Sequence, residues 1–147
     1  MKVNNFFIFV SALTMVAYIL TFLIFMYYMI FPIKIMTFIQ EPTPTRENRT
    51  YAPGEKLQYT SIVDHHTENV HVDISRKLTN QTNGTVVLPG YSYITKKANF
   101  QRTDSVTIPE DVEEGDYNLV IIRKFEINKL RDVVIQTSTV VHIKNKK

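Results

Sequence analysis

Hydrophobic residues are distributed in two different ways along this chain. Residues 6–33 are almost entirely apolar and contain no Asp, Glu, Lys, Arg or His. An α-helix needs about 20 apolar residues to cross a bilayer core of about 30 Å. This stretch therefore predicts one N-terminal transmembrane helix, preceded by a short cytoplasmic tail at residues 1–5.

The end of the apolar stretch differs from the cleavage site of a secretory signal peptide. It carries Tyr27, Tyr28 and Pro32 where a signal peptidase requires small residues. We therefore expect an uncleaved signal anchor whose aromatic residues lie near the interface of a lipid bilayer. Lys2 and Lys34 lie on opposite flanks of the helix, so the positive-inside rule gives little preference for either orientation. The very short N-terminal tail instead favours a cytoplasmic N-terminus, with the rest of the chain outside the cytoplasm.

The pattern after the helix is polar and then alternating. Residues 34–50 contain Pro42 and Pro44 among polar residues and are expected to form an extended, proline-rich tether. Residues 51–147 carry short alternating runs separated by turn signals, and no amphipathic helix is evident. Such a series predicts one all-β domain, an antiparallel β-sandwich. The expected strands lie within residues 57–63, 70–74, 85–88, 91–95, 105–108, 117–125 and 133–143.

A local signature around Tyr117 refines this prediction. The segment Gly115-Asp116-Tyr117-x-Leu119 resembles the tyrosine corner of immunoglobulin domains, in which a tyrosine at the start of a strand bonds back to the upstream backbone. Leu119 would then take the place of the cysteine of that family. The alternative is an ordinary turn followed by a strand aromatic. The signature favours an immunoglobulin-like β-sandwich.

Several short motifs in residues 52–143 together resemble a set of small tailed-bacteriophage proteins with an N-terminal hydrophobic segment. The motifs are Pro53-Gly54-Glu55, Ser75-Arg76-Lys77-Leu78, Glu114-Gly115-Asp116-Tyr117-x-Leu119 and Asn128-Lys129-Leu130-Arg131. Lys129 replaces the proline of the family's late turn, and the cysteines of some members are absent. The resemblance implies a phage-encoded protein of the host envelope, in a family without an established activity.

Charge and cysteine content exclude several classes of function. Lys and Arg number 17 against 14 Asp and Glu, giving a formal net charge of +3, and the two signs are interspersed. A nucleic-acid-binding protein would instead show a basic stripe, so we expect no nucleic-acid partner. The chain contains no cysteine, which excludes disulfides and thiolate chemistry.

Candidate chemistry is confined to one group of potential metal ligands. This group comprises Asp64, His65, His66, His71 and Asp73. On a strand, Asp64 and His66 share a face while His65 points to the other, and a metal site needs three or four converging ligands. A polar loop is therefore the favoured interpretation. No serine lies in a nucleophile-elbow motif. We expect no enzyme, metal or cofactor, and convergence of Asp64, His66 and His71 would revive the enzyme hypothesis.

The late turn is the most informative part of the predicted domain. Asn128, Leu130 and Arg131 can form a turn stapled by local contacts. The functional alternative is that these three residues, with Arg76 and Lys77, form a polar rim that recognises a partner, because loops at the ends of sandwiches often bind.

Three Asn-x-Thr sequences, at Asn48, Asn80 and Asn83, match the glycosylation acceptor pattern. They would be sites in a eukaryotic secretory setting, whereas the phage resemblance favours chance occurrence.

Together these observations predict a non-catalytic interaction module at the host cell envelope, bound to the bilayer and to a host or phage envelope protein. The alternative is a structural subunit of a virion or a membrane assembly. The sequence leaves the oligomeric state open.

Overall fold

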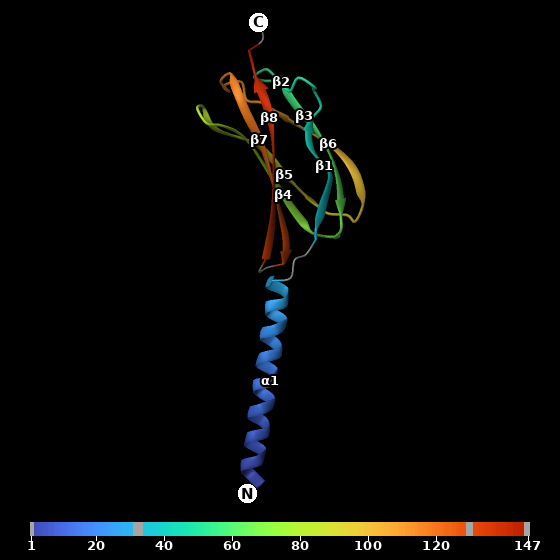
Figure 1. Ribbon diagram of the computed structural model, residues 1–147, viewed down its shortest axis with the longest axis vertical. Coiled ribbons are helices and arrows are strands. Elements are labelled where there is room, and N and C mark those ends of the chain that lie inside the picture. The colour runs from blue at the N-terminus through green and yellow to red at the C-terminus, as the bar shows by residue number, and fades with distance from the viewer. Residues whose placement is uncertain (1, 31–33, 129–130, 146–147) are drawn as a thin grey trace. The chain divides into compact units, whose positions relative to one another are not determined.

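The computed structural model describes residues 2–30, 34–128 and 131–145 and divides into two compact units. The first unit, Met1–Ile33, contains helix α1 (Lys2–Ile30), and the second, Lys34–Lys147, contains the strands (Figure 1). Within α1, the segment Phe7–Met29 is long and apolar enough to cross a membrane. Its large apolar side chains are exposed within the chain, so lipid or another protein must cover them.

Two threonines of α1 bond to the helix itself. The Thr14 hydroxyl donates to the carbonyl oxygen of Val10, and the Thr21 hydroxyl donates to that of Ala17, both at 2.8 Å. Their polar groups are therefore satisfied without a neighbour.

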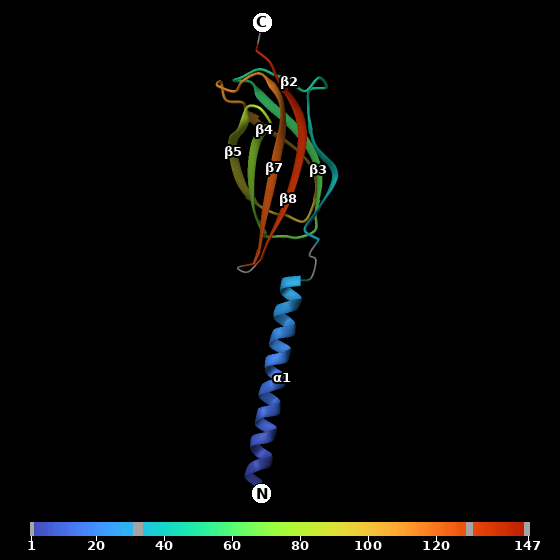
Figure 2. The same cartoon turned by 60° about the vertical axis from the view of Figure 1, so that its left-hand side comes forward.

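The strands of the second unit form two sheets that pack face to face as a β-sandwich (Figures 1 and 2). Among the described residues, one sheet has the order β1-β3-β6 and the other the order β2-β8-β7-β4-β5. All pairs are antiparallel except β2 with β8, which is parallel. The strands are β1 (Met36–Pro44), β2 (Thr50–Tyr51), β3 (Lys56–His65), β4 (His71–Asn80), β5 (Gly84–Ile94), β6 (Asn99–Thr107), β7 (Gly115–Asn128) and β8 (Arg131–Ile143).

The predicted tether at residues 34–50 is wrong, because this segment belongs to the sandwich. Strand β1 pairs with β3, and Ile35 and Met36 are buried in the core. Pro42 and Pro44 are tolerated because β1 is an edge strand with two register shifts, where a missing N–H costs no ladder bond. The folded unit thus begins at Lys34 instead of Tyr51.

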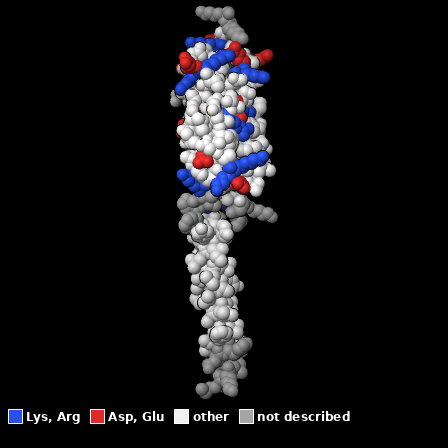
Figure 3. All heavy atoms as spheres, turned by 90° about the vertical axis from the view of Figure 1, so that its right-hand side faces the viewer, with Lys and Arg blue, Asp and Glu red and all other residues white. Residues whose placement is uncertain are grey.

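The core lies between the sheets and follows the period-two pattern of the sequence. Alternate residues of β3, β4 and β7 point inward, and the largest fully buried side chains include Tyr59, Tyr117 and Phe125. On the face shown in Figure 3, charged side chains gather toward the two ends of the sandwich and leave a largely uncharged middle.

The two runs predicted within residues 85–88 and 91–95 are one strand, β5. An irregularity opposite Ser75 of β4 absorbs Pro89 and Gly90. A Cβ atom at Gly90 would lie 2.4 Å from the carbonyl oxygen of Ile74, so this close approach requires glycine.

Candidate functional site

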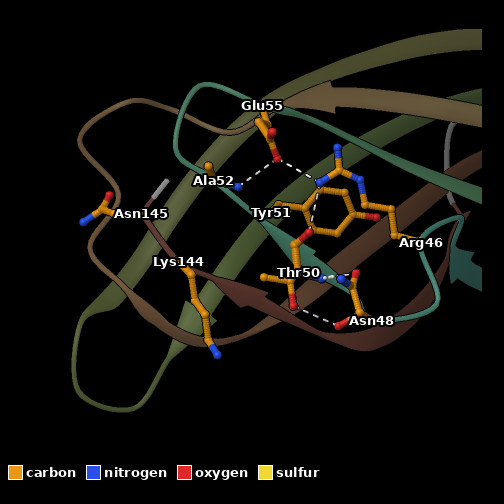
Figure 4. A pocket seen from close by; sticks show the side chains of 8 residues that line it. All are labelled: Arg46, Asn48, Thr50, Tyr51, Ala52, Glu55, Lys144 and Asn145. Atoms are coloured by element: carbon orange, nitrogen blue, oxygen red, sulfur yellow. Dashed lines mark hydrogen bonds and ion pairs between the residues drawn. The ribbon is translucent and has the colours of Figure 1, made fainter. Parts of the chain in front are cut away.

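A pocket opens at one end of the sandwich, where the loops beside β2 meet the last residues of β8 (Figure 4). Its volume is about 420 Å³ and it is open to solvent. Strand β1 begins at the opposite end of the sandwich, where Met36 pairs with His65. It ends near the pocket, where Pro44 pairs with Tyr59. We call these the Lys34 end and the pocket end. The pocket is lined by Arg46, Asn48, Thr50, Tyr51, Ala52, Glu55, Lys144 and Asn145.

Arg46 and Glu55 connect the two loops that flank β2. Arg46 Nη1 donates to Glu55 Oε2 at 2.9 Å and to the carbonyl oxygen of Thr50 at 3.0 Å. Glu55 Oε2 also accepts the backbone N–H of Ala52 at 2.9 Å. The Arg46 guanidinium lies 4.8 Å from the centre of the Tyr51 ring. This network holds the wall of the pocket and balances the charge of Arg46.

The loop from Asn48 to Thr50, which also lines the pocket, is held by hydrogen bonds to its own backbone. Asn48 Oδ1 accepts the N–H of Thr50 at 3.2 Å, and the Thr50 hydroxyl donates to the carbonyl oxygen of Asn48 at 3.0 Å. Arg49 adopts a left-handed conformation with φ of 50°, and its carbonyl oxygen accepts the N–H of His142 at 2.8 Å. The loop is therefore ordered before any ligand binds.

The two residues that follow β8, Lys144 and Asn145, supply the other wall. The backbone N–H of Lys144 donates to the carbonyl oxygen of Tyr51 at 2.9 Å, and that of Asn145 donates to Glu114 Oε1 at 2.8 Å. Within the described part of the chain, the exposed Lys144 ammonium has no ion-pair partner. The pocket can thus offer one positive charge and several amide and carbonyl groups to a partner.

Arg76, predicted on a polar rim, is instead buried between the sheets. It is 6% exposed, and its guanidinium donates to the carbonyl oxygen of Pro89 through both Nε, at 2.7 Å, and Nη2. Its Nη1 donates to the carbonyl oxygen of Ser105 at 3.1 Å and lies 3.4 Å from the Tyr59 hydroxyl. Because Pro89 is on β5 and Ser105 is on β6, Arg76 joins the edge strands of the two sheets.

A second arginine closes the same side of the sandwich. The Arg102 guanidinium lies 4.7 Å from the ring centres of both Tyr91 and Tyr93. Asp104 accepts Arg102 Nε at 2.9 Å and the Tyr91 hydroxyl at 2.8 Å. Burial, followed by the bond to Asp104, raises the pKa of Tyr91. The two tyrosines of β5 and the Arg102–Asp104 ion pair of β6 thus pack against each other and cover this side of the sandwich.

His65 and Arg123 are also buried, and among the described residues neither forms a salt bridge to a carboxylate. His65 is 1% exposed, stacks on Phe100, and leaves its Nδ1 without a hydrogen bond. Arg123 is 3% exposed, donates to the Thr137 hydroxyl at 3.3 Å and lies over the Phe38 ring. Burial, reinforced by the positive charges of Arg123 and Arg102, lowers the pKa of His65, and burial also lowers the pKa of Arg123.

The structure does not assemble the predicted rim. Lys77 lies on the outer face of β4 opposite Val120, whereas Asn128 and Arg131 pair where β7 and β8 meet at the Lys34 end. Leu130 lies outside the described residues. Lys77 pairs with Val120, which is eight residues along β7 from Asn128, so Lys77 lies about 26 Å from the β7–β8 turn at about 3.3 Å per residue.

Tyr117 is buried, and its hydroxyl donates to the carbonyl oxygen of Glu113 at 3.1 Å. This is the backbone contact expected of a tyrosine corner. The same hydroxyl accepts Asn83 Nδ2 at 3.2 Å, and Asn80 Nδ2 donates to the carbonyl oxygen of Asp116 at 2.7 Å. The amides of two Asn-x-Thr sequences thus hold the β6–β7 loop, a role that the sequence did not reveal.

His66 and His71 form separate pairs with aspartates instead of one cluster, and His65 is buried apart from both. His66 Nδ1 lies 3.8 Å from Asp64, and His71 Nε2 lies 3.2 Å from Asp73 on the other sheet. In the described residues no three His, Asp or Glu side chains converge on one point.

Sequence reasoning missed the pocket because three of its eight lining residues, Arg46, Asn48 and Thr50, fall in the predicted tether. The apolar run Ile35-Met36-Thr37-Phe38-Ile39 was the available signal that a strand precedes them. Nothing in the sequence indicated that Lys144 and Arg46 would line one pocket.

Comparison with known proteins supports the fold alone. No family model matches the chain, and no curated protein matches it. Among solved structures, the Niemann-Pick type C2 protein from Japanese carpenter ant has 9% identity and a TM-score of 0.50, with 76% of this chain and 94% of that one covered.

Two further structures are less similar. Spo0M, a sporulation control protein from Bacillus subtilis, has 12% identity, a TM-score of 0.47 and coverage of 78% of this chain and 51% of its own, so the chain spans about half its length. A superoxide reductase (neelaredoxin) from Ignicoccus hospitalis has 10% identity and a TM-score of 0.45, covering 71% and 81%. The likeness to the Niemann-Pick type C2 protein supports a β-sandwich, which an apolar N-terminal helix precedes in this chain.

Proposed function

We propose that this protein is a single-pass, membrane-anchored interaction module without catalytic activity, which presents the pocket end of its sandwich to a protein partner outside the cytoplasm. The observation that carries the proposal is the pre-ordered, open pocket, formed at the opposite end of the sandwich from Lys34. The Lys144 ammonium, which has no ion-pair partner among the described residues, and the amide groups of the pocket suit the carboxylates and backbone of a polypeptide. Loops on a rigid sandwich are common positions for recognition.

An immunoglobulin-like topology is part of this proposal. Its support is the order of the strands in the two sheets. In one sheet, β1-β3-β6 corresponds to strands A, B and E of that fold. In the other, β8-β7-β4 corresponds to strands G, F and C, and β5 is one added strand. Tyr117, near the start of β7 and bonded to Glu113, is a second supporting feature.

The distribution of exposed apolar side chains favours transient binding over permanent assembly. On the sandwich these are Ile39, Val87, Ile94, Val134 and Val140. They are divided among β1, β5 and β8, and scattered single residues are normal on a monomer. A buried assembly surface would gather them into one patch.

The cellular setting is proposed from the sequence resemblance alone. On this proposal the protein is phage-encoded and lies in the envelope of the infected host. There it contacts a host or phage envelope protein, for example to exclude a second infecting phage. The comparisons with known proteins add no support for the phage origin.

Topology and binding can be tested in the same cells. Protease added to spheroplasts should remove the sandwich, and full protection would reverse the proposed orientation. A photo-crosslinking residue at Asn48 should give a discrete adduct with an envelope protein, and the substitution Lys144→Glu should abolish it. The matched control places the crosslinker at Thr103, on the outer face of β6. Equal labelling from both positions would contradict a binding role for the pocket.

A further inference from the structure

The edge strands of the sandwich differ in how well they are protected against pairing with another strand. Edge strands expose unpaired backbone groups, which proteins shield with proline, irregularities or inward charges. Strand β5 has Pro89 and the irregularity at Gly90, and β6 has the inward Arg102 and Asp104. Strand β1 has two register shifts and Pro42.

Strand β8 has none of these features between β2 and the β7–β8 turn, and β1 lies near β8 without pairing with it in the described residues. At one end β2 pairs with His142 and Ile143, and at the other the strand meets the β7–β8 turn. Between them, residues 133–141 contain no charge, proline or glycine, and most are Val, Ile or Thr. No irregularity interrupts the pairing with β7 over these nine positions, so this window is straight and rich in β-forming residues.

The direction of the backbone groups in this window follows from two hydrogen bonds. The N–H groups of His142 and Lys144 donate away from β7, to the carbonyl oxygens of Arg49 and Tyr51. Because these directions alternate along an antiparallel strand, the N–H and C=O groups of Val134, Gln136, Ser138 and Val140 point to the free edge. No loop-type backbone hydrogen bond reaches these four residues within the described part of the chain.

We propose that this window pairs with the same window of a second copy of this chain. The window is centred on Thr137, so antiparallel pairing about a twofold axis places Val134 opposite Val140 and Gln136 opposite Ser138. In both pairs each residue points its backbone groups at the other, as a hydrogen-bonded antiparallel pair requires. Val134 and Val140 are 59% and 42% exposed, and this register covers each with the other.

Self-pairing uses a different surface from the proposed partner pocket. The β8 edge and the pocket meet only at β2, where the edge is already occupied. Antiparallel pairing sets the Lys34 end of each copy beside the pocket end of the other, so self-pairing and partner binding are alternative states of the sandwich, and the two crosslinking tests report on them separately.

The test uses the full chain in detergent and exploits its lack of cysteine. Two differently tagged variants, Val134→Cys and Val140→Cys, are co-expressed and oxidised. Residues directly opposite in such a pair have Cα atoms about 5.5 Å apart, a distance that a disulfide bridges. We expect a disulfide-linked heterodimer in the mixture. Each variant alone should give none, because its own cysteines would be about 20 Å apart, six residues along the strand.

A third variant separates edge pairing from association through α1. Adding Ser138→Lys to both cysteine variants places a charge at the centre of the edge and should abolish the crosslink while the melting temperature of each monomer is kept. Equal crosslinking in the mixture and in the single variants, or a dimer in size-exclusion chromatography without the heterodimer crosslink, would overturn the proposal.

Discussion

Arg76, predicted at the surface, is buried and hydrogen-bonds to backbone carbonyls of both sheets. It lies at an inward position of β4, and its guanidinium satisfies backbone carbonyls of both β5 and β6, which a single ammonium cannot reach together. Arg76→Lys should therefore lower the free energy of unfolding by about 2–3 kcal/mol, the range for charged hydrogen bonds. The neighbouring exposed substitution Lys77→Ala should change it by less than about 0.5 kcal/mol. Denaturant melts of the two variants compare them, and equal effects would contradict the edge-joining role.

Tyr117 tests the corner between β6 and β7. Tyr117→Phe removes a buried hydroxyl that donates to Glu113 and accepts from Asn83, at an expected cost of about 1–3 kcal/mol. Tyr51→Phe is the matched control, since Tyr51 is equally buried but its hydroxyl lies 3.4 Å from its acceptor. Chemical denaturation should show the larger loss for Tyr117→Phe. If the two substitutions cost the same, the corner contributes no specific stability.

His65 makes stability depend on pH. Its pKa is lowered in the folded state by burial and by Arg123 and Arg102, with Asp64 and His66 as smaller influences, so the unfolded chain binds a proton more readily. Stability is therefore complete above the unfolded pKa of about 6.5 and falls as the pH drops below it, by at most about 1.4 kcal/mol per pH unit.

The variant His65→Phe keeps an aromatic ring against Phe100 and should flatten this dependence. The measurement is the free energy of unfolding between about pH 6.5 and 5, above the usual carboxylate range. His71→Gln, at a half-exposed position, should leave the slope in place. An unchanged slope in His65→Phe would assign the dependence to other groups.

At the scale of the elements, β5 depends on one glycine. Gly90→Ala forces a Cβ atom against the carbonyl oxygen of Ile74, so β4 and β5 must move apart or lose their register. We expect a loss of about 1–3 kcal/mol, as for overpacking of a well-packed site. Ser92→Ala, exposed on the same strand, is the control and should be nearly neutral. Thermal melts of both variants measure the difference, and a neutral Gly90→Ala would show that the strands adapt freely.

The elements also show which parts of the fold could be read from the sequence. Period-two alternation located β3, β4 and β7 because one face of each strand is buried. It failed for β1, where two prolines dominate the local pattern and the decisive contacts come from β3, a distant segment. The pocket was missed for the same reason: Lys144 and Arg46 are brought together by pairing of β2 with β8, which no local pattern encodes.

At the scale of the whole molecule, the position of β1 decides which fragment folds alone. The fragment Lys34–Lys147 is the complete second unit and should be soluble and unfold cooperatively, as single domains of this size usually do. A fragment of residues 51–147 lacks β1, exposes the edge of β3 and uncovers the core beside Ile35 and Met36. It should be insoluble or non-cooperative in urea melts. Equal behaviour of the two fragments would show that β1 is dispensable.

The antiparallel ladder between β1 and β3 has a mechanical consequence. Tension that reaches the sandwich through Lys34 acts on the first residues of β1, while a partner held at the pocket end would resist from the opposite end of that strand. Such a pull runs along β1 and shears its hydrogen bonds with β3 together, instead of peeling them open one after another. The sandwich should therefore transmit force between bilayer and partner without unravelling from its first strand.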